Sequence, residues 1–86
     1  MKRKPRGWPV VGSFFHEHAN GAIERQGRVL SKELRGHYFV EWFSFLDGYA
    51  TKRELVPFDR MIGWTFYPSE ELMRKAWELE DRRRQK

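Results

Sequence analysis

Aromatic rings are the residues of this chain best suited to binding chemistry, and six of them crowd between residues 38 and 49. In a strand, alternation sends Phe39, Phe43 and Phe45 to one face and Tyr38 and Trp42 to the other, so both faces are apolar. Either the strand is covered on both sides, or one face displays rings to a ligand. Exposed rings on a small domain can stack the bases of a single-stranded nucleic acid.

The basic residues point toward a polyanionic partner. Residues 1–6 contribute +4 and residues 81–86 contribute +3 to the net charge of +5, so residues 7–80 carry −2. A run of like charges at a chain end is either simply exposed to solvent or binds phosphate groups. We predict a nucleic-acid partner, DNA or RNA, contacted by Lys2, Arg3, Lys4, Arg6, Arg25, Arg28, Lys52, Arg53, Arg82, Arg83 and Arg84.

The histidines and acids give little sign of catalysis. His16 and His18 share one face of a strand, but a metal site needs further ligands, and only His37 is available from another strand. The pattern favours a surface histidine pair, so no metal or cofactor is predicted. Glu41 is either a base with a raised pKa or, as we favour, a partner of Lys52 or Arg53 across a hairpin. We expect no enzyme.

Length and composition set the class of protein. A chain of 86 residues without cysteine predicts one domain whose core depends on aromatic packing rather than on disulfides. No run of apolar residues approaches the ~18 of a membrane span. We therefore expect a cytoplasmic protein with no membrane partner.

Turn and cap signals divide the chain into short strands and one helix. Asn20-Gly21 and Asp47-Gly48 predict tight hairpin turns, and Ser69 predicts the start of a helix over 69–83. The helix is expected to dock through Leu72 and Trp77, with an oligomer contact through this helix or an edge strand as the alternative. The predicted strands are 8–17, 22–31, 37–46, 49–56 and 62–66, with one helical turn at 58–61. The predicted core is Leu30, Val40, Leu55, Val56, Ile62, Trp64 and Trp77.

A family resemblance lies in the hairpin. Residues 40–48 (Val-Glu-Trp-Phe-Ser-Phe-Leu-Asp-Gly) and 55–58 (Leu-Val-Pro-Phe) resemble the core hairpin of SH3-like barrels of the Tudor and PWWP kind. The resemblance spans about residues 10–62. A weaker similarity is to the plasmid type II dihydrofolate reductases, but residues 51–55 lack their Val-Gln-Ile-Tyr segment.

The resemblance to Tudor domains implies an aromatic cage that holds a methylated lysine or arginine by cation–π attraction. The positions that match such a groove are Phe15, Trp42, Phe45 and Tyr49, with Asp47 as an acidic rim. The chain departs from the pattern at Ile23 and Arg25, where a cage would have a ring. It also has only Trp8-Pro9 of the PWWP signature.

These observations predict a mainly β fold: a small five-stranded SH3-like barrel with a C-terminal α-helix. The expected organisation is a basic tail at 1–6, the barrel at 7–67, and a helix with a basic end at 68–86. The predicted function is a non-catalytic nucleic-acid-associated binding module, in which basic tails contact phosphates and exposed rings stack bases. The alternative is a protein-interaction module that binds a peptide or a methylated side chain in an aromatic groove.

Overall fold

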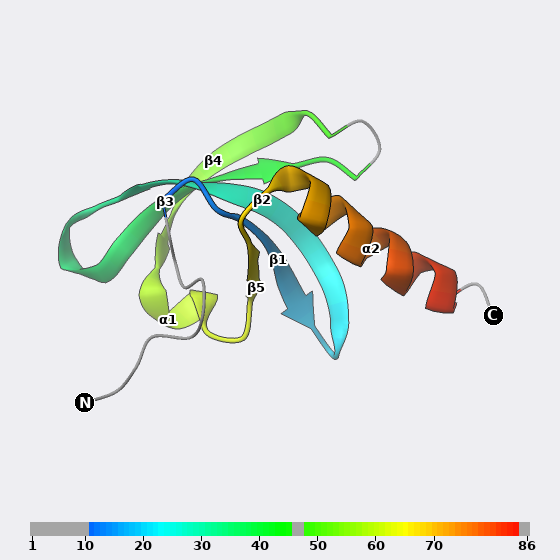
Figure 1. Ribbon diagram of the computed structural model, residues 1–86. Helices are drawn as coiled ribbons and strands as arrows, with labels where there is room; N and C mark the ends of the chain where they lie inside the picture. The colour runs from blue at the N-terminus through cyan, green and yellow to red at the C-terminus, as the bar shows by residue number, and fades with distance from the viewer. Residues whose placement is uncertain (1–10, 46–47, 85–86) are drawn as a thin grey trace.

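One antiparallel sheet of five strands and a C-terminal helix make up the computed structural model, which describes residues 11–45 and 48–84 (Figure 1). The strands follow the order β4-β3-β2-β1-β5, so β4 and β5 are the two edges and the sheet does not close into a barrel. The mainly β class with a C-terminal helix is therefore confirmed, with an open sheet. The elements are β1 (Phe14–Ala19), β2 (Ala22–Lys32), η1 (Leu34–Gly36), β3 (His37–Phe43), β4 (Ala50–Pro57), α1 (Phe58–Met61), β5 (Thr65–Tyr67) and α2 (Glu70–Arg84).

Local sequence chemistry explains several element boundaries. Asn20 and Gly21 both have positive φ, as a two-residue hairpin turn between β1 and β2 requires. The backbone N–H of Leu72 donates to the Ser69 hydroxyl at 3.3 Å, which confirms the predicted helix cap. The single helical turn expected at 58–61 is α1.

Other boundaries differ from the prediction. Within the described residues the first strand begins at Phe14, because Gly12 has a φ of 91° and lies before the ladder; residues 8–10 are outside the described part. The fifth strand is Thr65–Tyr67 rather than 62–66, since α1 is followed by a turn at Gly63 with a φ of 93°.

The inner face of the sheet carries the core. The ring of Phe15 stacks on Trp64 with centroids 4.6 Å apart and meets Trp42 edge-on at 5.3 Å. Gly27 lies under these rings, and a Cβ there would collide with the Phe15 ring and the Glu41 carbonyl. The buried apolar side chains around them include Val29, Tyr38, Val40, Val56 and Met61.

Part of the predicted core is wrong. Val40, Val56 and Trp64 are buried as expected, but Leu55 is 51% exposed and Ile62 is 65% exposed. Alternation explains Leu55, because it pairs with Phe39 on the outer face while the next residue, Val56, points inward. Ile62 directly follows α1 at the surface. The remaining two, Leu30 and Trp77, are half-buried.

Helix α2 covers one end of the outer face. It contacts β1, β2 and β5, and buries Met73 along with the outer-face side chains of His16 and Gln26. The predicted docking through Leu72 is wrong, because Leu72 is 45% exposed whereas its neighbour Met73 is buried and makes the contact. No helix in the described part of the chain is long and apolar enough to cross a bilayer.

Candidate aromatic groove

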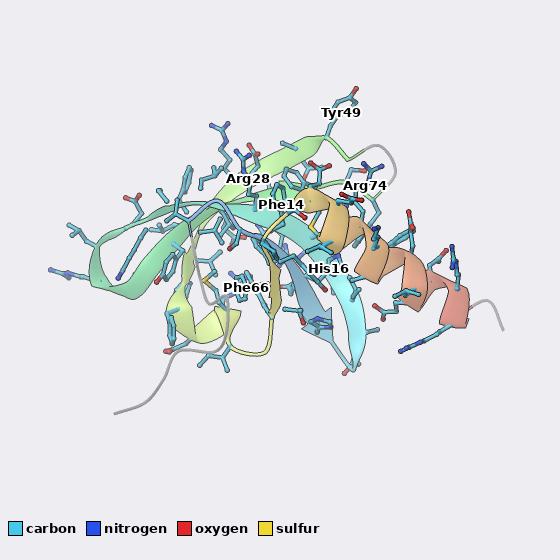
Figure 2. The ribbon with its side chains drawn as sticks, in the orientation of Figure 1. Phe14, His16, Arg28, Tyr49, Phe66 and Arg74 are labelled. Atoms are coloured by element: carbon cyan, nitrogen blue, oxygen red, sulfur yellow. The ribbon has the colours of Figure 1, made fainter. Side chains whose placement is uncertain are left out.

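A cavity of about 370 Å³ lies between the β3–β4 hairpin and α2. We call it the aromatic groove and define it by its rings Phe43, Phe45, Tyr49 and Trp77 and its charged residues Glu70, Arg74 and Glu78. Gln26 and Met73 form part of its lining. In Figure 2, Tyr49 rises from the end of the hairpin, and Arg74 lies beside the first turns of α2.

The rings join two elements that are far apart in sequence. Phe45, just after β3, stacks on Trp77 of α2 with centroids 5.4 Å apart and an interplanar angle of 22°. Tyr49, just before β4, is 75% exposed beside them. The groove therefore presents aromatic surface to solvent, held in place by the hairpin and the helix together.

The groove also carries an excess of negative charge. Glu70 lies 3.9 Å from Arg74, while Glu78 forms no ion pair with any residue in the described part of the chain. Two carboxylates against one guanidinium leave a net charge of −1 around the rings. Ring faces and carboxylates both attract cations, so the lining suits a positively charged guest.

The structure corrects the predicted membership of this groove. Phe45 and Tyr49 lie together in it as predicted, but Phe15 and Trp42 are 0% and 2% exposed in the core. Asp47 lies outside the described residues. The sequence prediction missed Trp77, because a tryptophan at helical spacing with Met73 gives the same signal whether it faces the core or a groove.

Arg25, a predicted phosphate ligand, belongs instead to a charged cluster on the inner face. Its guanidinium donates to Glu17 at 2.6 and 2.9 Å and lies 3.9 Å from the Trp42 ring centroid. The hydrogen bond to Glu17 raises the pKa of Arg25 despite its partial burial. Glu54 accepts from Trp42 Nε1 at 2.9 Å and from Arg60 at 3.1 Å. Burial favours the protonated form of Glu54, but these two hydrogen bonds, together with the charges of Arg60 and Lys52, outweigh burial and lower the pKa of Glu54.

The other predicted phosphate ligands are more accessible. Arg53 pairs with Glu41 at 3.0 Å, as expected across the hairpin, and its side chain remains 63% exposed. The Arg28 guanidinium lies 5.9 Å from the Phe14 ring centroid. Lys52, Arg82 and Arg83 are exposed. The structure does not describe Lys2, Arg3, Lys4, Arg6 or the side chain of Arg84.

The histidines do not form a surface pair. His16 is fully buried, and its Nδ1 lies 2.9 Å from the Tyr67 hydroxyl, whereas His18 is exposed and contacts Thr65. Burial, and then the charge of His18, lower the pKa of His16 to about 4, against opposing effects of Gln26 and Glu80. In the described residues, no three histidine, aspartate or glutamate side chains gather as a metal site would require.

Comparison with known proteins adds no relative. No protein-family model, no curated protein and no solved structure matches this chain. The case for a function therefore rests on the geometry of the groove and of the sheet.

Proposed function

We propose that this protein is a non-catalytic protein-interaction module whose aromatic groove binds a cationic side chain of a partner peptide. The observation that carries the proposal is the Phe45–Trp77 stack beside the exposed ring of Tyr49 and the carboxylate of Glu78. A lysine, an arginine or a methylated form of either would place its charge against ring faces. Each such contact contributes about 0.5–1 kcal/mol when exposed and about 2 kcal/mol when desolvated.

The dimensions of the groove support a side chain as guest. Ligand pockets commonly measure about 300–1,000 Å³, and the groove, at about 370 Å³, lies at the lower end. The net negative charge of its lining favours a cation over a phosphate group. Arg74 at the wall gives a second point of contact for a partner carboxylate or backbone carbonyl.

The resemblance to Tudor-type SH3-like barrels belongs to this proposal. The five-stranded antiparallel sheet, the bending of β2 in Figure 1 and the helical turn after β4 support it, whereas the open edges of the sheet differ from a closed barrel. The groove has its own construction, however, because one wall is α2 with Trp77.

Peptide arrays test the proposal. Otherwise identical peptides would carry lysine, trimethyllysine, arginine, dimethylarginine or norleucine, the last being the neutral counterpart of lysine. We expect cationic peptides to bind and norleucine peptides to fail. Equal capture of norleucine and lysine peptides would overturn the role of charge.

Two groove variants and a matched control locate the binding site. Tyr49→Ala and Glu78→Gln should each lower the affinity for the best cationic peptide about threefold to thirtyfold. This is the range expected for the loss of one cation–π or charge contact, from an exposed contact to a desolvated one. Glu71→Gln removes an equal charge from the same helix, where Glu71 pairs with Lys75 outside the groove. This control should bind like the unaltered protein. A loss in the control as large as in Glu78→Gln would indicate a nonspecific charge effect.

A further inference from the structure

The part of the outer face that α2 does not cover combines arginine side chains with apolar ones. Phe14, Arg28, Glu41 and Arg53 are paired neighbours on four adjacent strands, so their side chains form one row across this face. The next row contains Phe39 and Leu55, which are also paired. We define the outer basic face as Phe14, Arg28, Phe39, Arg53 and Leu55. Figure 2 shows Phe14 and Arg28 together on the side of the sheet opposite Phe66.

The two arginines of this face are available to an anion. Arg28 lies over the Phe14 ring and forms no ion pair with a carboxylate in the described part of the chain. Arg53 keeps most of its side chain exposed while Glu41, which is only 12% exposed, orients it. With strands about 4.8 Å apart, Arg28 on β2 and Arg53 on β4 lie about 10 Å from each other across the sheet. The guanidinium groups can therefore contact separate phosphates of one strand.

Apolar surface accompanies these cations. Phe14 and Phe39 are half-buried, and Leu55 is exposed next to Phe39. The Phe14 ring is steadied by Phe43, with centroids 6.2 Å apart. Surfaces that combine arginine with aromatic side chains bind single-stranded nucleic acid, because the phosphates contact the guanidinium groups and the bases stack on the rings.

We propose that the outer basic face binds single-stranded nucleic acid. Arg28 and Arg53 contact phosphates, and Phe39, with Phe14 beside it, stacks on bases. The face carries a net charge of +1 once Glu41 is counted, whereas the aromatic groove carries −1, so a polyanion is directed to the sheet rather than to the groove. This site does not depend on the groove or on its guest.

A salt series with the full chain tests the electrostatic part. Anisotropy of fluorescein-labelled oligothymidylate and oligouridylate would be followed as salt increases, for the unaltered protein and for Arg28→Gln and Arg53→Gln. Each variant should reduce the slope of log K against log salt by about 0.7, the value for one phosphate contact to a single strand. Lys75→Gln removes an equal charge from an exposed side chain on α2, outside both the face and the aromatic groove, and should leave the slope unchanged. Unaltered slopes in both Arg28→Gln and Arg53→Gln would overturn the proposal.

Stacking needs a separate variant that keeps the fold. Phe39→Leu retains an apolar side chain of similar size but removes the ring, and it should weaken binding about fivefold or more at constant salt. Oligoglutamate serves as a competitor without bases. If oligoglutamate displaces the oligonucleotides at equal charge concentration, the face is a docking site for acidic proteins and the nucleic-acid proposal is wrong. Tyr49→Ala should bind oligonucleotides normally, so failure of this proposal is distinguishable from failure of the groove.

Discussion

The carboxylate of Glu80 on α2 accepts the backbone N–H of Ile23 on β2, with Oε1 at 2.9 Å and Oε2 at 3.2 Å. The β1–β2 pairing shifts register between Glu17 and His18, and Ile23 is the first β2 partner beyond that shift. A side chain of the helix thus provides the hydrogen-bond acceptor for a strand N–H group that lies beside an irregularity in the sheet. Because Trp77 lies one turn earlier on the same helix, this contact also helps to hold a wall of the aromatic groove.

Removing this contact should loosen α2. We expect Glu80→Ala to lower the free energy of unfolding by about 1.5–3 kcal/mol, the usual contribution of a hydrogen bond to a charged group. Glu80→Gln keeps an acceptor oxygen and should lose less. Urea denaturation followed by circular dichroism measures both variants. Equal stability of Glu80→Ala and the unaltered protein would show that the contact contributes nothing.

Gly27 should tolerate no side chain. A Cβ at this position would lie 2.8 Å from the Phe15 ring and closer still to the Glu41 carbonyl, in a part of the sheet that cannot yield without moving the core. We expect Gly27→Ala to cost about 1–3 kcal/mol of stability, as overpacking in a dense core does. Thermal unfolding monitored by tryptophan emission is a suitable measurement. A melting temperature equal to that of the unaltered protein would contradict the close approach.

Stability should fall in mild acid because of His16. Its pKa is about 4 in the folded protein against an ordinary value of 6.5, so between these values the unfolded chain binds the proton more readily. The contribution is complete above pH 6.5, declines as pH falls, and stops changing below about pH 4. The loss is on the order of 3 kcal/mol. His16→Gln should flatten this part of the stability curve, and a curve of unchanged shape in that variant would assign the acid sensitivity elsewhere.

The N-terminal basic segment should strengthen nucleic-acid binding regardless of the nucleotide sequence. Deleting residues 1–6 removes four positive charges, so affinity for oligothymidylate should fall steeply at low salt and little at high salt. Circular dichroism should show the same secondary structure before and after the deletion. If affinity at low salt does not change, this segment takes no part in binding.

Sequence reasoning succeeded where a few neighbouring residues decide the structure. Asn20-Gly21 specifies its turn through positive φ, and Ser69 specifies a helix start through its hydroxyl. It failed where the structure depends on contacts between segments that are far apart in the sequence. Phe15 and Trp42 are core because Trp64, which follows them by more than 20 residues, packs against both, and Trp77 lines the groove because α2 brings it against Phe45.

The open edge of the sheet has a consequence for solubility. Within the described residues β4 pairs only with β3, so one side of an eight-residue strand offers free backbone donors and acceptors to another chain. Lys52 and Arg53 stand on this edge, and their charges oppose the approach of a second identical strand. Salt screens that repulsion. The positive side chains of β4 therefore act as gatekeepers against edge-to-edge assembly at this edge, and their effect should weaken as salt increases.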